Sequence, residues 1–137
     1  MADYRITKII KFCYGHRLLD YEGKSKNLHG HNAHVEIDVV SKTLDKRGMV
    51  TSFDSLKEAI ESWVQKNFDH RVILSDSDPI GDVLEGVGQI VNKLTVNPTS
   101  ENLAKILFMV TQDMGFEVSE VRFWETPTSC GSYSGGG

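Results

Sequence analysis

Three histidines have the spacing of a metal site. His29 and His31 are separated by a single glycine, and His16 lies upstream of them. If residues 29–31 lead into an extended strand, alternate side chains share a face and the two imidazoles point the same way. Three histidine ligands with a fourth position open for water or substrate are a common set for catalytic zinc. The spacing therefore favours a metal site over the alternative of separate structural histidines.

A period-two alternation predicts the strands that carry these histidines. Residues 4–16 alternate between apolar and polar, and His16 ends the apolar face. Residues 17–28 are polar and rich in turn formers, which is typical of a loop. Residues 31–39 alternate again, so His34 falls on the face opposite the paired histidines. We interpret His34 as an exposed residue or a subunit contact rather than as a ligand.

Apolar residues at helical spacing predict two helices. The first covers residues 53–68, with Thr51 as its capping residue, and can cover the sheet. The second begins at Thr99 or Ser100 as its N-cap and ends at Gly115, because glycine is a natural helix stop. Each helix therefore presents one apolar stripe to the rest of the domain.

The remaining segments give weaker patterns. Residues 118–126 indicate a last strand, whose apolar face ends in a carboxylate. Residues 75–97 are hard to assign and are expected to be a functional or mobile loop, or to contain a short helix over 83–94. Residues 131–137 are expected to form a flexible tail. Together, the strand-like runs and the two helices predict an α+β fold.

Composition and charge limit the function classes. The 137 residues are expected to form one domain, spanning 1–137. The formal net charge of −4 and the lack of a basic stripe argue against a nucleic-acid partner. The two cysteines have no zinc-finger spacing and give no disulfide framework. The sequence has no signal-peptide pattern and no apolar run long enough to span a membrane. We therefore expect a cytoplasmic protein without a membrane partner.

Seven short motifs follow one another along nearly the whole chain. They are Phe12-Cys13-Tyr14-Gly15-His16-Arg17-Leu18, Leu28-His29-Gly30-His31-Asn32, Gly48-Met49-Val50, Phe53 with Leu56-Lys57, Phe68-Asp69-His70, Pro98-Thr99 with Glu101-Asn102, and Glu125-Thr126. In this order they resemble the 6-pyruvoyl-tetrahydropterin synthase and 6-carboxy-tetrahydropterin synthase family. The resemblance implies the tunnelling fold (T-fold), a four-stranded antiparallel sheet with two helices on one face. It also implies a homo-oligomer in which sheets join into a barrel, a hexamer of two trimers with active sites at subunit interfaces.

The resemblance assigns roles to two groups of residues near the predicted metal. The three histidines look like the ligands of Zn²⁺, which would act as Lewis acid and template. Asp69 and His70 look like the family's proton-transfer pair, in which the carboxylate orients the imidazole. Without the resemblance, His70 fits equally a residue placed favourably against the C-terminal end of a helix dipole.

The resemblance also implies a pocket for the pterin ring. Glu125 looks like its anchor, because an ionised carboxylate accepts both the ring N–H and the adjacent exocyclic amine. The alternative for Glu125 is a strand-end carboxylate that pairs with a nearby Lys or Arg. Thr126 and Thr99 look like residues that line the same pocket.

One position departs from the family pattern. The family has a cysteine base four residues before the first histidine of the H-G-H pair, where this chain has Ser25. An alcohol is a much weaker base than a thiol. Ser25 is therefore an engineered replacement, or the mark of a divergent branch in which His70 or zinc-bound hydroxide is the base, or the mark of a chain that only binds its ligand. Cys13 lies on the face opposite His16 and is an unlikely substitute, while Cys130 follows the last strand and could approach the pocket.

The expected function is a zinc-dependent lyase that converts 7,8-dihydroneopterin triphosphate to 6-carboxy-tetrahydropterin, in the biosynthesis of 7-deazaguanine and queuosine. The closest alternative is a 6-pyruvoyl-tetrahydropterin synthase, which eliminates triphosphate and keeps all three side-chain carbons. A rival from another class is a protein that only binds a pterin, or one whose zinc is structural. Lys11, Arg17, Lys24 and Lys26 are candidates for attracting the triphosphate.

Overall fold

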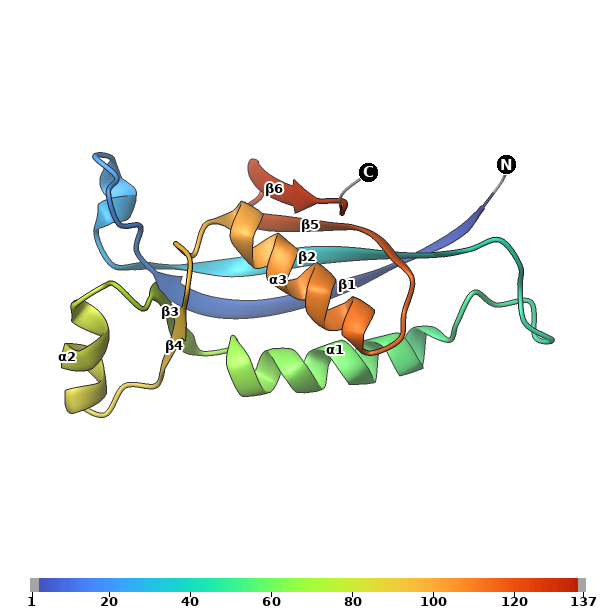
Figure 1. Ribbon diagram of the computed structural model, residues 1–137, viewed down its shortest axis with the longest axis horizontal. Coiled ribbons are helices and arrows are strands. Elements are labelled where there is room, and N and C mark those ends of the chain that lie inside the picture. The colour runs from blue at the N-terminus through green and yellow to red at the C-terminus, as the bar shows by residue number, and fades with distance from the viewer. Residues whose placement is uncertain (1–2, 136–137) are drawn as a thin grey trace.

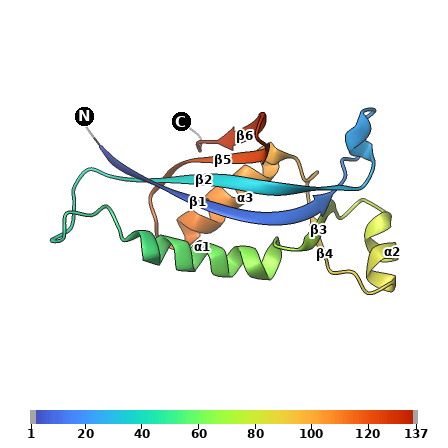
Figure 2. The same ribbon diagram turned by 180° about the vertical axis from the view of Figure 1, so that it is seen from behind.

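A computed structural model describes residues 3–135 of the chain (Figures 1 and 2). Its elements in chain order are β1 (Tyr4–His16), the single 3-10 turn η1 (Lys24–Lys26), β2 (His29–Ser41), α1 (Phe53–Asn67), β3 (Arg71–Ser75), α2 (Ile80–Gly86), β4 (Val91–Leu94), α3 (Ser100–Asp113), β5 (Val118–Thr126) and β6 (Ser129–Tyr133). None of the helices within 3–135 has the length and apolarity needed to cross a membrane.

All strands belong to one mixed sheet with the order β4-β3-β1-β2-β5-β6. β1, β2, β5 and β6 pair antiparallel, whereas β3 runs parallel to both β1 and β4. The α+β class is confirmed, but the expected four-stranded sheet is wrong in strand number, because two parallel strands extend the antiparallel part. β3 and β4 have 5 and 4 residues, which is too short for a readable alternation.

Helices α1 and α3 lie on the same face of the sheet, as expected, and α2 lies beyond it near β3 and β4 (Figures 1 and 2). The Ser52 hydroxyl caps α1 by accepting a hydrogen bond from the Ser55 backbone N–H at 3.0 Å. Thr51 is therefore not the cap, because the capping pattern is satisfied one residue later. The Thr99 hydroxyl caps α3 by accepting from the Asn102 backbone N–H at 3.2 Å, as predicted.

The core fills the space between these two helices and the sheet. It takes alternate residues from the strands and one stripe from each helix, among them Phe12, Val35, Ile37, Leu56, Ile60, Leu103, Leu107, Val121 and Phe123. Tyr14 and His16 continue the same face of β1 to its end and are only 3% and 1% exposed. The sheet therefore carries a row of buried side chains that changes from apolar to polar at one end.

The secondary structure of segment 75–97 differs from the expectation. A seven-residue helix, α2, begins three residues before the predicted range 83–94 and ends within it at Gly86, and residues 91–94 form β4 instead of a helix. The Asp78 carboxylate accepts hydrogen bonds from the Ile80 backbone N–H at 3.0 Å and from Arg17 Nε at 2.7 Å. Several apolar side chains of this segment are exposed, among them Val83 at 64% and Val87 at 71%, whereas Leu94 packs against the core. The apolar residues of this segment therefore do not mark one buried face.

A strand occupies part of the expected flexible tail. β6 pairs with β5 and includes residues 131–133, so this part of the expected tail is an ordered strand. A Cβ at Gly131 would come within 2.8 Å of the Glu101 backbone N and would also collide with the Ser100 side chain. Glycine here lets β6 approach the start of α3. Gly136 and Gly137, also assigned to the expected tail, lie outside the described residues.

Candidate metal centre

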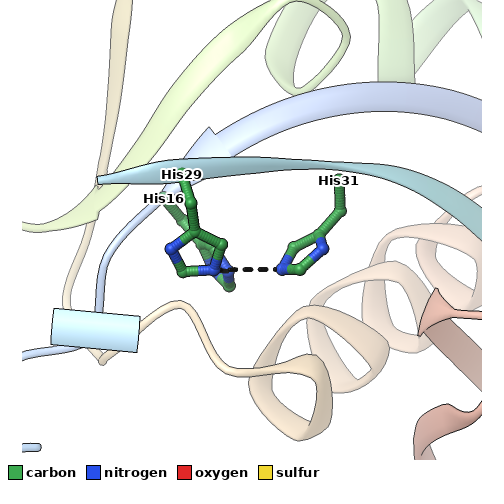
Figure 3. Close-up of side chains that lie close together, drawn as sticks. All are labelled: His16, His29 and His31. Carbon is green, nitrogen blue, oxygen red and sulfur yellow. Dashed lines mark hydrogen bonds between the residues drawn. The ribbon is translucent and has the colours of Figure 1, made fainter. Parts of the chain in front are cut away.

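The three predicted ligands converge on one point. The register of β1 and β2 places His16 opposite His29, and His31 follows two residues later on the same face. In Figure 3 the rings leave these two strands on the side where α3 lies and bring their Nε2 atoms together. The Nε2 atom of His29 is 3.1 Å from that of His16 and 3.1 Å from that of His31. The extended start of β2 thus points both imidazoles of the H-x-H pair to the same face, as the spacing predicted.

Hydrogen bonds fix the protonation of two of these rings. His16 Nδ1 lies 2.8 Å from the Pro98 carbonyl oxygen, and His29 Nδ1 lies 2.7 Å from the Asn27 carbonyl oxygen. A carbonyl oxygen only accepts, so each Nδ1 must carry the proton and donate it. The Nε2 lone pairs of His16 and His29 then face each other at 3.1 Å, which is repulsive for two neutral rings. A bound cation removes this repulsion, so the donor set fits a metal ion.

Burial favours the neutral form of two of the imidazoles, His16 and His31. It lowers the pKa of His16 to about 4, with the charges of His29 and His31 adding to the shift and the hydrogen bond to Pro98 opposing it. Burial also lowers the pKa of His31, helped by the charge of His29. Neutral imidazole is the form that ligates metals, so His16 and His31 are ready to bind at neutral pH. Three nitrogen ligands leave room for a further ligand atom.

Glu125 is the carboxylate nearest to this cluster. It ends the buried face of β5, and its Oε2 lies 3.8 Å from His31 Nε2. Burial raises the pKa of Glu125, and the charge of His29 opposes that shift. Glu125 thus lies beside the three histidines, on the face of β5 that it shares with Val121 and Phe123.

The two threonines of the predicted pocket lie apart. The Thr99 hydroxyl caps α3, next to the Pro98 carbonyl that holds His16. Thr126 borders a different hollow of about 360 Å³, together with His34 and Trp124. Its hydroxyl accepts a hydrogen bond from the Thr128 backbone N–H at 3.2 Å. Alternation along β5 separates Thr126 from Glu125, because neighbouring residues on a strand point to opposite faces.

Asp69 and His70 form a second cluster with Cys13. Asp69 Oδ1 accepts from His70 Nδ1 at 3.0 Å and from the Cys13 backbone N–H at 3.2 Å. The Cys13 thiol lies 4.0 Å from the same oxygen. His70 has a positive φ of 57°, and its backbone N–H donates to the Cys13 carbonyl at 2.8 Å. The sequence predicted the Asp–His pair but missed its neighbour, since the contact with Cys13 spans 56 positions of the chain.

The second cluster lies across the sheet from the first. Cys13 and His16 have opposite parity on β1, so their side chains leave opposite faces, as expected. A hollow of about 510 Å³ borders both clusters and is lined by Cys13, His70, His29 and His31. Within residues 3–135, no hydrogen bond joins His70 to any of the three histidines. The side chains of Cys13 and His16 thus leave opposite faces of β1, although one hollow is lined by residues of both clusters.

The position of the missing cysteine lies in the loop before β2. Ser25 belongs to η1, is partly buried, and accepts a hydrogen bond through its backbone carbonyl from the Leu18 backbone N–H at 2.9 Å. Arg17, a candidate for attracting phosphate, is instead bound to the buried carboxylate of Asp78. Lys24 and Lys26 flank Ser25 and are exposed. Positive charge near this loop therefore comes from the two lysines.

Comparisons with known proteins agree with this arrangement. A family profile described as 6-pyruvoyl tetrahydropterin synthase matches residues 5–136. A 6-carboxy-5,6,7,8-tetrahydropterin synthase from Rickettsia bellii is 37% identical over 130 residues, which cover 90% of this chain and 94% of the relative. A protein of the same name from Haemophilus influenzae is 28% identical, with 95% and 98% covered.

Solved structures share the whole fold. A crystal structure of an uncharacterized protein from Wolinella succinogenes superposes with a TM-score of 0.78 at 27% identity, covering 98% of this chain and 99% of that chain. A 6-pyruvoyl tetrahydropterin synthase from Caenorhabditis elegans gives a TM-score of 0.75 at 24% identity, covering 99% and 98%. The family profile spans nearly the entire chain, and the R. bellii relative exceeds 30% identity over most of it. The chain therefore belongs to the 6-pyruvoyl tetrahydropterin synthase family.

Proposed function

We propose that this chain is a zinc-dependent lyase that converts 7,8-dihydroneopterin triphosphate to 6-carboxy-tetrahydropterin, a step toward 7-deazaguanines and queuosine. The observation that carries the proposal is the set of three imidazoles, one buried and two partly buried, in which the His29 Nε2 atom lies 3.1 Å from that of His16 and 3.1 Å from that of His31. The 37% identical relative named 6-carboxy-5,6,7,8-tetrahydropterin synthase supports this reaction over others in the family.

The Nε2 atoms of His16, His29 and His31 would hold the zinc ion. When bound, zinc supplies a Lewis acid that polarises the oxygens of the substrate side chain and acidifies the C–H bonds beside them. The carbonyls of Pro98 and Asn27 keep the ligating nitrogens aimed at the metal by accepting from Nδ1 of His16 and His29. Such outer partners typically account for a 10- to 100-fold share of metal affinity.

Glu125 would orient the pterin ring beside the metal. Its carboxylate accepts two parallel hydrogen bonds, which the ring N–H and the exocyclic amine of a pterin can donate. Partial burial makes these bonds stronger than they would be in water. Thr99 would contribute indirectly, through the helix start that places the Pro98 carbonyl. Thr126 keeps no role in this proposal, because it borders another hollow.

His70 would move protons, oriented by Asp69. Because the Asp69 carboxylate can only accept, His70 Nδ1 carries the proton and Nε2 is left as the base. The two clusters leave opposite faces of β1, so His70 of one copy would serve the histidines of another. We therefore propose a homo-oligomer with sites between subunits, a hexamer of two trimers whose sheets join into a barrel, acting in the cytoplasm.

Turnover of dihydroneopterin triphosphate by the zinc-loaded protein, beside a Ser25→Cys variant, tests the function. We expect activity in at least one of the two, with the 6-carboxy product identified by mass. Activity in the Cys variant alone would mean that the serine removes the base, and activity in both would make His70 the first candidate. A product that keeps all three side-chain carbons would instead assign the 6-pyruvoyl synthase reaction. No turnover by either protein would contradict the lyase proposal and favour a binding role.

A further inference from the structure

The second cluster gathers three kinds of metal ligand. Cys13, Asp69 and His70 place a thiol, a carboxylate and an imidazole together, with all three donor atoms within 4.8 Å of one another. Asp69 Oδ1 lies 3.0 Å from His70 Nδ1 and 4.0 Å from Cys13 Sγ. Sulfur, nitrogen and oxygen donors of these types are the ligands that zinc takes from proteins. The cluster therefore has the composition of a metal site as well as that of a proton-transfer pair.

Backbone hydrogen bonds fix the three side chains relative to one another. The Cys13 backbone N–H donates to Asp69 Oδ1 at 3.2 Å, and the His70 backbone N–H donates to the Cys13 carbonyl at 2.8 Å. His70 has a φ of 57°, a left-handed conformation that costs a non-glycine residue about 1 to 3 kcal/mol. The surrounding structure holds His70 in this conformation, so its imidazole stays beside the other two donors.

The separations of the donor atoms are close to those of a tetrahedral zinc site. A Zn–S bond of about 2.3 Å and Zn–N and Zn–O bonds of about 2.0 Å set the ligand atoms about 3.3 to 3.6 Å apart. The N–O separation of 3.0 Å is slightly shorter than this, and the S–O separation of 4.0 Å is slightly longer. Shifts of about half an ångström close both differences. The His70 side chain is 76% exposed and has the freedom to make them.

An ion can reach the cluster, and the charges of the ligands match it. A hollow of about 600 Å³ is lined by Cys13, Asp69 and His70, with His34 and Asn32 beside them, and leaves space for water as a further ligand. A Cys13 thiolate and the Asp69 carboxylate together neutralise a divalent ion. Because Mg²⁺ and Ca²⁺ prefer oxygen ligands throughout, the sulfur and nitrogen donors favour zinc or another thiolate-binding divalent ion.

We propose that Cys13, Asp69 and His70 form a second site for a thiolate-binding divalent ion such as Zn²⁺, and that its occupation blocks proton transfer by His70. On binding, the Cys13 thiol loses its proton to solvent and sulfur bonds to the metal. The ion also takes the lone pair of His70 Nδ1, whose proton is lost while Nε2 gains one, so one proton is released overall. His70 then has no basic nitrogen. The block rests on the proposed function, because it assumes that His70 is the base.

The second site should bind zinc more weakly than the three histidines do. The carbonyls of Pro98 and Asn27 already leave the Nε2 atoms of His16 and His29 without a proton. A metal at the second cluster must instead displace protons from both Cys13 and His70, which lowers its apparent affinity. We therefore expect the second site to fill only after the first holds one zinc ion per chain.

Cobalt titration of the protein loaded with one zinc ion per chain tests the inference. Co²⁺ bound to a thiolate gives a sulfur-to-metal charge-transfer absorption, and the three-histidine centre has no sulfur to produce it. We expect this absorption in the wild type and in Cys130→Ser, and its loss in Cys13→Ser. Cys130 is the matched control, because it is the second of the two cysteines in the chain and lies outside the cluster. Excess Zn²⁺ should remove the absorption by displacing cobalt.

Turnover of dihydroneopterin triphosphate at rising zinc concentration tests the block on His70. Zinc beyond one ion per chain should inhibit the wild type and Cys130→Ser. Cys13→Ser should need more than about tenfold more zinc for the same fractional inhibition, since a ligand contributes at least as much affinity as an outer partner does.

The outcomes separate this inference from the proposed function. No charge-transfer absorption in the wild type, or the same absorption in Cys13→Ser, would overturn the second site. Absorption together with turnover that excess zinc does not change would overturn the block on His70. A protein that gives the absorption but no turnover at any zinc concentration, also as Ser25→Cys, would contradict the proposed function and with it the block, but not the metal site.

Discussion

The two titratable clusters beside the end of β1 differ in what holds their histidines. In the metal centre, His16 and His29 donate to neutral backbone carbonyls, and the side chain of His16 is buried while that of His29 is partly buried. In the second cluster, His70 pairs with the Asp69 carboxylate, and its side chain is 76% exposed. A carbonyl partner leaves a lone pair aimed at a cation, whereas a carboxylate partner makes the ring a better base. The pairing therefore suits one cluster to metal binding and the other to proton transfer.

The variant with the largest expected effect on the metal centre is His29→Ala. Because the His29 Nε2 atom lies between those of the other two histidines, its loss should reduce zinc affinity by more than about 100-fold and abolish turnover. Metal analysis by mass spectrometry and circular dichroism would measure both binding and folding. The protein should remain a folded oligomer. Global unfolding of the variant would show that the metal is structural and would remove the distinction between the clusters.

His70→Ala should give the opposite pattern. We expect turnover to fall by about 10² to 10⁴ because the proton-transfer group is gone, while zinc content remains that of the wild type. Steady-state kinetics with metal analysis on the same sample would check this. Cys13→Ser is the matched control, since Asp69 is held by the Cys13 backbone N–H and not by the thiol. An equal loss of turnover in Cys13→Ser would identify the thiol as a participant.

Glu125→Gln tests whether the carboxylate next to the metal centre binds the pterin and not the metal. The amide keeps the shape of the side chain but replaces one acceptor oxygen with a donor, so pterin affinity should fall about 10- to 100-fold. Zinc content should stay the same, because Glu125 lies 3.8 Å from His31 and outside the set of three histidines. Pterin fluorescence titration would measure the change. Unchanged affinity would remove Glu125 as the anchor of the ring.

Of these variants, Asp78→Asn is expected to change the two clusters least. Asp78 holds Arg17 at the start of the loop that leads to His29, so we expect a stability loss of about 1 to 3 kcal/mol at pH 7 and less than tenfold weaker zinc binding. The hydrogen bond from Arg17 lowers the pKa of Asp78, although burial opposes it. This stabilisation is therefore present above the unfolded-state pKa near 3.8 and is lost as the pH falls through the lower folded-state pKa.

Urea unfolding at pH 7 and at pH 2.5, with and without zinc, would check the Asp78 prediction. The wild type should lose more stability between the two pH values than Asp78→Asn does. The Asp69–His70 pair should be unaffected, because it lies in the turn between α1 and β3. Equal acid sensitivity in the two proteins would mean that the Arg17–Asp78 pair does not stabilise the loop.

The sequence alone determined the parts of the fold that depend on neighbours along the chain. Alternation over residues 4–16 and 31–39 predicted β1 and β2, and helical spacing predicted α1 and α3 with Thr99 as a cap. The H-x-H spacing predicted converging imidazoles, because side-chain direction in a strand has a period of two. The order of the motifs was sufficient to indicate the family.

Only the tertiary structure decided the contacts between distant segments. β3 and β4 are defined by parallel pairing, and their short runs carry no local pattern of their own. The carbonyl that fixes the His16 tautomer comes from Pro98, 82 residues away, and Cys13 meets Asp69 across 56. Local spacing sets the direction of a side chain, but what that side chain meets is decided by the packing of the whole domain.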